Sequence, residues 1–236
     1  MTAPEVVLVH SPFVGPASVS PVAAALRALG YAVAEPARSA AWDVGPPYYR
    51  ELARRVASAI KPDPETPLVL VAHSGAGGLL PSVAEAVQGR VCAAIFLDAL
   101  TPHPGQTWFE TAPAELRARL RSRTIDGRLP AWSGWFPSEV IANLLPDLAQ
   151  REAFIAELEA VPAAYVDEVA PECPHWPPAG CGYLQLSEGY AAEADQASAA
   201  GWIVERDIIH HLATATHPDR VASSLHLLIS ALTASS

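Results

Sequence analysis

Short runs of consecutive apolar residues alternate along the chain with longer segments whose apolar residues recur every three or four positions. The uninterrupted runs predict strands buried on both faces, and the longer periodic segments predict helices. The expected strands are Val6–Val9, Tyr31–Ala34, Leu68–Ala72, Val91–Leu97, Gly182–Leu186 and Trp202–Val204. The expected helices are Val19–Leu29, Tyr48–Ile60, Gly75–Val87 and Pro218–Leu232. This alternation indicates an α/β fold, a mostly parallel sheet with helices on both faces.

Residues 101–180 interrupt the alternation. The segment is rich in proline and has two expected helices, Pro113–Arg123 and Pro137–Val161, but no obvious core strand. We therefore expect residues 1–100 and 181–236 to form the core and residues 101–180 to form a helical cap. The segment could be a helical extension of the core or a cap whose aromatic side chains line a pocket. The candidates for contact with a substrate are Trp108, Trp132, Trp135 and Phe136.

Composition narrows the class of protein. The chain has 236 residues, of which half are apolar and 17% are charged, and this excludes a disordered chain. The net charge is −10 and no lysine or arginine cluster stands out, so we expect no nucleic-acid partner. No apolar stretch is long enough to span a membrane, and the first residues do not form a signal-peptide pattern. We expect a small-molecule substrate as partner and leave open whether the chain pairs as a homodimer.

The number and spacing of the cysteines indicate the redox state of the cellular compartment. Their number is odd, and Cys92, Cys173 and Cys181 do not form a metal-binding C-x-x-C pair. Cys173 and Cys181 could bridge across a loop, but we favour free thiols. We expect no metal site and a reducing, cytoplasmic location.

Ser74 is the strongest candidate for chemistry. It follows a buried strand directly and precedes a helix, and its neighbours Ala72, Gly75 and Ala76 are small. A nucleophile on a sharp strand-to-helix turn needs small neighbours, because the strained backbone brings them into contact. The alternative is a glycine-rich phosphate loop, since such loops also lie at helix starts. The stretch lacks the G-x-G-x-x-G spacing and follows the third strand, which favours the nucleophile.

Two adjacent histidines precede the last helix, where a base for Ser74 is expected. His210 and His211 both follow the last strand, at the edge where Ser74 lies. We favour His211 as the base and regard His210 as a structural neighbour. His217, at the start of the helix, is expected to be a surface or capping residue.

Four stretches together resemble the α/β-hydrolase superfamily over essentially the whole chain. They are Val-Leu-Val-His10-Ser-Pro-Phe-Val-Gly15, Val-Ala-His-Ser74-Gly-Ala-Gly, Ile-Phe-Leu-Asp98-Ala and His211-Leu-Ala-Thr-Ala-Thr-His-Pro-Asp-Arg-Val. More narrowly, the chain is similar to small bacterial α/β hydrolases related to the plant esterase and hydroxynitrile lyase branch. The resemblance implies a Ser-acid-His triad, a cap after the fourth strand and no required cofactor.

The resemblance leaves two candidates for the acid. In most members the acid follows the strand after the cap, where Glu188 is the available carboxylate. In the haloalkane dehalogenase type it ends the strand before the cap, the position of Asp98. We favour Asp98, and either residue could fix the tautomer of His211.

The resemblance also implies an oxyanion hole and raises a difficulty with it. One donor is the backbone N–H of Gly75, directly after the nucleophile. The second is expected two residues past His10, where Pro12 has no N–H. Phe13, or Val14, could supply the donor if the loop shifts.

The leading hypothesis is therefore a serine hydrolase that acts on an ester, thioester or lactone of a small apolar or aromatic acid. A non-hydrolytic lyase, cyclase or cofactor-free decarboxylase that uses Ser74 and His211 for proton transfer is the alternative, motivated by Pro12. A ligand-binding relative without chemistry is a third hypothesis, against which the intact Ser74 and His211 argue.

Overall fold

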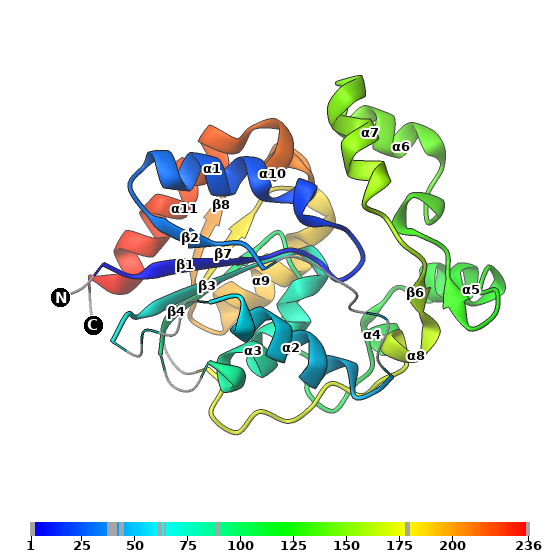
Figure 1. Ribbon diagram of the computed structural model, residues 1–236, viewed down its shortest axis with the longest axis horizontal. Coiled ribbons are helices and arrows are strands. Elements are labelled where there is room, and N and C mark those ends of the chain that lie inside the picture. The colour runs from blue at the N-terminus through cyan, green and yellow to red at the C-terminus, as the bar shows by residue number, and fades with distance from the viewer. Residues whose placement is uncertain are drawn as a thin grey trace.

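A parallel sheet runs through the centre of the molecule (Figure 1). The computed structural model describes residues 3–36, 42, 45–60, 63, 65–87, 90–177 and 180–234. Across the sheet, the six strands within these residues are β2 (Ala32–Ala34), β1 (Glu5–Val9), β3 (Leu68–His73), β4 (Val91–Leu97), β7 (Gly180–Gln185) and β8 (Ile203–Arg206). Every adjacent pair is parallel, so the strands all end at one edge. The predicted α/β class is confirmed.

The strands are apolar on both faces because both faces are covered. In β1, Val7 faces one hydrophobic core and Val6 faces the other. Leu70 and Val69 of β3 divide in the same way, and all four side chains are fully buried. Continuous burial is the reason why these strands read as unbroken apolar runs.

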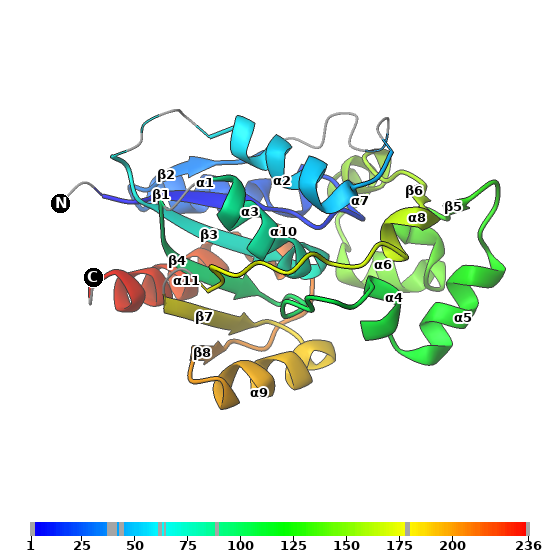
Figure 2. The same cartoon turned by 90° about the horizontal axis from the view of Figure 1, so that it is seen from below.

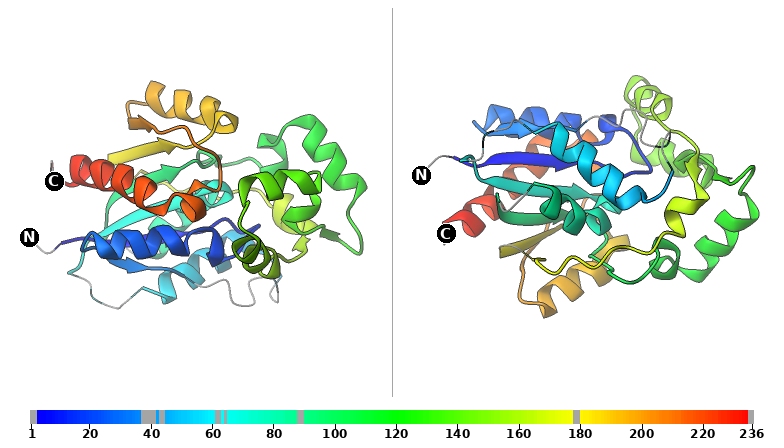
Figure 3. Two further views of the ribbon diagram at one scale, coloured as in Figure 1. Left: turned by 90° about the horizontal axis from the view of Figure 1, so that it is seen from above. Right: turned by 60° about the horizontal axis from the view of Figure 1, so that its bottom comes forward.

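Helices cover the two faces in two groups (Figures 2 and 3). One face carries α1 (Ser20–Ala28), α10 (Ala213–Thr216) and α11 (Pro218–Thr233). The other carries α2 (Tyr48–Ser58), α3 (Leu80–Ala86) and α9 (Ala191–Ala199). The sequence pattern did not predict α9. It buries only two alanines, Ala194 and Ala197, so it has no stripe of large apolar residues to reveal it.

The segment between β4 and β7 forms a separate group of elements beyond the carboxyl ends of the strands, on the right of Figure 1. Its elements are α4 (Trp108–Thr111), α5 (Ala114–Ser122), β5 (Arg128–Leu129), a 3₁₀-helix (Trp132–Gly134), α6 (Ser138–Leu144), α7 (Leu148–Ala156), β6 (Val161–Pro162) and α8 (Ala163–Val166). We call it the insertion. Within it, β5 and β6 pair as a short antiparallel ribbon.

The single helix expected over Pro137–Val161 is wrong, because the structure has two helices there. Pro146 lies between α6 and α7, and its missing N–H prevents an uninterrupted helix. Asp147 begins the second helix, and its side chain accepts a hydrogen bond from the N–H of Gln150 at 2.8 Å. The ribbon strand β6 then occupies the end of the predicted range.

Two partly buried carboxylates attach the insertion to the core. The side chain of Glu157 accepts a hydrogen bond from the backbone N–H of Ala17 at 2.8 Å. Glu168 accepts from the N–H groups of Tyr48 and Tyr49 at 2.7 and 2.9 Å, at the start of α2. These N–H groups have no partner inside the helix, so Glu168 satisfies them and holds the insertion against α2.

Two expectations from composition can be compared with the structure. No disulfide joins Cys92, Cys173 or Cys181 within the described residues, which agrees with the predicted thiols. Among helices in the described ranges, none combines the length and apolar character needed to cross a membrane.

Candidate active site

Ser74 lies on a sharp turn at the end of β3. A 3₁₀-helix over Ser74–Leu79 begins at once and continues into α3, in place of the α-helix expected from Gly75. The φ angle of Ser74 is 60°, in the left-handed region that costs a non-glycine residue about 1–3 kcal/mol. The turn leaves Ser74 only partly buried, whereas Gly75 and Ala76 behind it are buried. The strained serine at this edge has the geometry of a nucleophile elbow.

Close packing accounts for the glycines that follow Ser74. A Cβ on Gly77 would lie 1.8 Å from the carbonyl oxygen of Leu100, and one on Gly78 would lie 2.3 Å from Cε1 of His103. Only glycine allows the 3₁₀-helix to pack so tightly on the segment after β4. The glycine-rich stretch is therefore explained without a phosphate, which favours the elbow interpretation.

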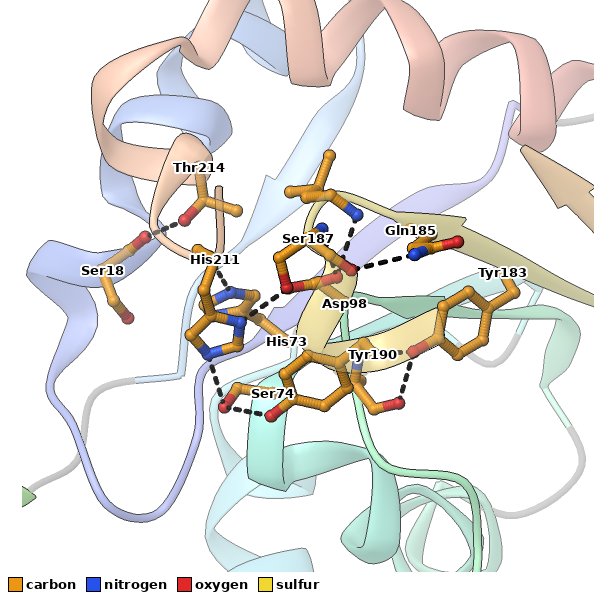
Figure 4. A network of polar contacts seen from close by, with 12 residues as sticks. Ser18, His73, Ser74, Asp98, Tyr183, Gln185, Ser187, Tyr190, His211 and Thr214 are labelled. Atoms are coloured by element: carbon orange, nitrogen blue, oxygen red, sulfur yellow. Dashed lines mark hydrogen bonds and ion pairs between the residues drawn. The ribbon is translucent and has the colours of Figure 1, made fainter. Parts of the chain in front are cut away.

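A continuous chain of hydrogen bonds joins three of the predicted site residues (Figure 4). Nε2 of His211 lies 3.0 Å from Oγ of Ser74, and Nδ1 of His211 lies 2.7 Å from Oδ2 of Asp98. An ionised carboxylate only accepts, so Nδ1 carries the proton of the neutral ring. Nε2 then has a free lone pair directed at the Ser74 hydroxyl.

Asp98 is fully buried and held by several donors. Its Oδ1 accepts from the backbone N–H groups of Leu186 and Ser187, each at 2.9 Å. Its Oδ2 accepts from the hydroxyl of Ser187 at 2.7 Å as well as from His211. Burial raises the pKa of Asp98, but the hydrogen bonds from His211, Ser187 and Leu186 outweigh it and hold the pKa below its usual value. The carboxylate is therefore ionised beside the imidazole.

The structure does not bring Glu188, the second candidate for the acid, to His211. Glu188 is exposed at the start of a 3₁₀-helix after β7, and Asp98 already accepts the Nδ1 proton of His211. Ser187, one residue earlier, is the residue whose side chain faces this site, and it donates to Asp98. Of the two candidate carboxylates, Asp98 is therefore the one that the structure brings to His211.

The imidazole of His211 is sandwiched between two rings that the sequence reasoning did not select. Tyr190 stacks on one side at 5.0 Å between ring centroids with 8° between the planes, and His73 stacks on the other at 4.9 Å and 25°. Nε2 of His73 also donates to the carbonyl of His211 at 3.0 Å. Burial, followed by the nearby charge of His211, lowers the pKa of His73 to about 3. His73 is therefore a neutral ring that stacks on His211 and donates to its backbone carbonyl.

Tyr190 also reaches the nucleophile. Its hydroxyl lies 3.4 Å from Oγ of Ser74, and burial raises its pKa, so the phenol stays protonated. A signal for it was present, since Tyr190 follows β7 at the edge where Ser74 lies. His210, by contrast, turns away and contacts the hydroxyl of Thr216 through Nε2 at 3.0 Å, as expected of a structural neighbour.

The loop after β1 lies against Gly75. A Cβ on Gly75 would lie 2.9 Å from Oγ of Ser11 and 3.1 Å from the ring of Phe13. The backbone N–H of Phe13, the predicted second oxyanion donor, points back instead and donates to Oγ of Ser11 at 3.3 Å. The N–H of Val14 donates to the Ser11 carbonyl at 3.1 Å. Both backbone alternatives to Pro12 are thus engaged within the loop, so the assignment of Phe13 is not supported by the geometry.

Solved structures of the same architecture match nearly the whole chain. An extracellular α/β-hydrolase from a Paenibacillus species superposes with a TM-score of 0.77 at 21% identity, covering 95% of this chain and 98% of its own. The chain has the α/β-hydrolase fold. Tomato methylketone synthase I, solved with 2-tridecanone, gives a TM-score of 0.71 at 15% identity, covering 98% and 100%. A pyrethroid hydrolase from Sphingobium faniae JZ-2 gives 0.70 at 18% identity, covering 98% of each chain.

Sequence comparison adds no closer relative to this α/β-hydrolase fold. No protein-family model matches the chain, and no curated protein matches it. At these identities the likeness establishes the fold, and the activity has to be argued from the site.

The aromatic residues predicted to contact substrate divide into two clusters. Trp108 and Trp135 are buried and pack on Phe13, with ring centroids 5.0 and 4.8 Å away. Trp132 and Phe136 pack on each other inside the insertion at 5.5 Å. The first cluster adjoins the loop beside Gly75, and in the second Trp132 also packs on Phe154 at 5.8 Å. The indole N–H of Trp108 is buried without a partner among the described residues.

The described residues contain no group of three or more histidine, cysteine, aspartate or glutamate side chains arranged to hold a metal ion. The site residues that the structure brings together are a serine, a histidine and an aspartate, a set that carries acyl-transfer chemistry with its own atoms.

Proposed function

We propose that this chain is a serine hydrolase of the esterase or thioesterase class. The observation that carries the proposal is the unbroken sequence of hydrogen bonds from Ser74 through His211 to Asp98, starting on a strained elbow. A serine nucleophile needs an adjacent base that a third group orients, and in α/β-hydrolases it lies exposed on a strained strand-to-helix turn. Ser74 meets both conditions.

The geometry supports an acyl-enzyme mechanism. Oγ of Ser74 attacks the carbonyl carbon of an ester while its proton moves to Nε2 of His211, and the carbonyl electrons move to the oxygen. Asp98 stabilises the imidazolium that forms. His211 then returns the proton to the departing alcohol or thiol. Water, deprotonated by the same nitrogen, attacks the acyl carbon; the bond from that carbon to Oγ then breaks, and His211 returns the proton to Oγ, which releases the acid and restores Ser74. The proposed substrate is an ester, thioester or lactone of a small apolar or aromatic acid, in keeping with the aromatic residues around Phe13.

Ser74→Ala tests the proposal. We expect the wild type to hydrolyse p-nitrophenyl butyrate and to react with a fluorophosphonate probe, and the variant to do neither. Ser58→Ala is a matched control, because Ser58 is exposed and its hydroxyl bonds only to the carbonyl of Arg55. A wild type that is inert towards a panel of ester, thioester and lactone substrates and towards the probe would rule the proposal out.

A second candidate is a non-hydrolytic lyase, cyclase or cofactor-free decarboxylase. The observations that favour it are Pro12 at the expected donor position and the neutral phenol of Tyr190 beside Ser74. In that case Ser74 and His211 move protons without an acyl-enzyme. Trapping of an acyl group on Ser74 would decide for hydrolysis.

A further inference from the structure

The oxyanion hole of this chain lacks a main-chain donor where one is expected. Gly75 lies at the start of the 3₁₀-helix, where N–H groups have no partner inside the helix, so its N–H can serve as the first donor. On the opposite loop, Pro12 has no N–H and the N–H groups of Phe13 and Val14 bond to Ser11. A single donor would stabilise the developing negative charge less well than the usual pair of donors.

Ser11 is a polar residue that lies beside the gap. Its Oγ would lie 2.9 Å from a Cβ on Gly75, so the hydroxyl is beside the residue that carries the first donor. Ser11 is almost fully buried, with 2% of its surface exposed. Its carbonyl is fixed by the N–H of Val14 and lies 3.0 Å from Nδ1 of His10. The backbone of Ser11 is therefore held in place by contacts within the loop.

The hydrogen bonding of Ser11 leaves its proton available. The hydroxyl oxygen accepts from the N–H of Phe13 at 3.3 Å. In the described part of the chain, this hydroxyl donates to no other group. A buried hydroxyl usually donates as well as accepts. The Phe13 bond fixes the oxygen and leaves the proton free to turn towards a ligand atom beside Gly75.

We propose that the hydroxyl of Ser11 is the second donor of the oxyanion hole and replaces the backbone N–H that Pro12 lacks. In the tetrahedral intermediate, the O–H of Ser11 and the N–H of Gly75 both donate to the former carbonyl oxygen. Phe13 acts through Ser11, because its N–H orients the hydroxyl. This inference rests on the proposed hydrolysis at Ser74 and assigns a catalytic role to a residue outside the triad.

Ser11→Ala and Ser11→Thr test the role, because the first removes the donor and the second keeps it. Loss of one oxyanion donor costs about 10²–10³ in rate, so we expect kcat of Ser11→Ala for p-nitrophenyl butyrate to fall by about that factor while KM changes little. Affinity for a trifluoromethyl ketone, which forms an anionic adduct with Ser74, should fall in parallel. Ser11→Thr should stay within about tenfold of the wild type on both measures.

A rescue experiment separates catalysis from structure. Pro12→Ala restores a backbone N–H, so Ser11→Ala/Pro12→Ala should regain at least part of the lost kcat. Ser18→Ala is the matched control: it removes a buried hydroxyl that donates to the carbonyl of Gly15 in the same loop, and it should leave kcat unchanged.

Two results overturn the inference. One is an unchanged kcat in Ser11→Ala. The other is a fall in kcat without a parallel fall in ketone affinity, with Ser11→Thr equally impaired and no rescue by Pro12→Ala. Failure of the proposed function is a different result, because the wild type itself would then neither react with a fluorophosphonate nor turn over the ester.

Discussion

Replacement of Asp98 by asparagine should prevent His211 from acting as a base, while a side chain of the same size still fills the position of Asp98. Two backbone N–H groups, of Leu186 and Ser187, point at Oδ1, so the amide oxygen of the asparagine should take that position. The amide nitrogen then replaces Oδ2 and faces Nδ1 of His211, which lies 2.7 Å from it in the native chain. Two donors cannot pair, so His211 should shift its proton from Nδ1 to Nε2.

The shift removes the lone pair that receives the proton of Ser74. A wrong tautomer of this kind costs a serine protease about 10⁴ in kcat, and we expect a loss of about 10³–10⁴ here. This corresponds to about 4–5.5 kcal/mol of transition-state stabilisation at 1.36 kcal/mol per tenfold change. The assay is kcat for p-nitrophenyl butyrate, with the thermal midpoint measured in parallel to confirm folding.

Glu188→Gln is the matched control, because Glu188 was the other candidate for the acid and is exposed. It should keep the wild-type rate within about twofold, as expected for a surface change away from the site. Loss of activity in Glu188→Gln, together with a nearly normal rate in a folded Asp98→Asn, would refute the assignment of the acid.

Two further predictions concern the elbow and its support. Gly77→Ala should lower the free energy of unfolding, measured in urea, by about 1–3 kcal/mol or prevent folding, because its Cβ would meet the Leu100 carbonyl. Gly45→Ala is the control, since open space surrounds that position, and its free energy of unfolding should change little. The depressed pKa of His73, about 3, means that the unfolded chain binds a proton below about pH 6.5 while the folded chain does not, so stability falls as pH falls through this window. His73→Gln lacks this group. Between pH 7 and 5 the free energy of unfolding of the variant should therefore decrease by about 2 kcal/mol less than that of the wild type. Equal decreases in the two proteins would contradict the assignment of a neutral buried His73.

The sequence predicted the core well because strands covered on both faces leave an unmistakable pattern. Val91–Leu97, for example, has the same limits in the pattern and in the structure. Local patterns failed where the packing is not apolar and periodic. Helix α9 buries only small alanines, and the predicted helix over 137–161 hid a break at Pro146.

At the site, the sequence could place Ser74 and His211 at the right edge and favoured Asp98 as the acid, but it could not exclude Glu188. Both carboxylates follow strands that end at this edge, and the choice depends on side-chain direction. The ring stack of Tyr190 on His211 joins two segments that are distant in the chain. The hydrogen bond from Phe13 to Ser11 is local and turns the N–H of Phe13 back into its own loop. The position of Tyr190 after β7 could be inferred from the sequence, but no sequence spacing reveals either contact.

The central claim, that Ser74 is a nucleophile that forms an acyl-enzyme, is tested most directly by trapping that intermediate. Wild type and Ser74→Ala are mixed with p-nitrophenyl butyrate, quenched in acid within the burst phase, digested and analysed by mass spectrometry. We predict a butyryl group on the peptide that contains Ser74 in the wild type and none in the variant. Either of two results would contradict the account: turnover of the ester by the wild type with no acyl group on that peptide, or undiminished turnover by Ser74→Ala.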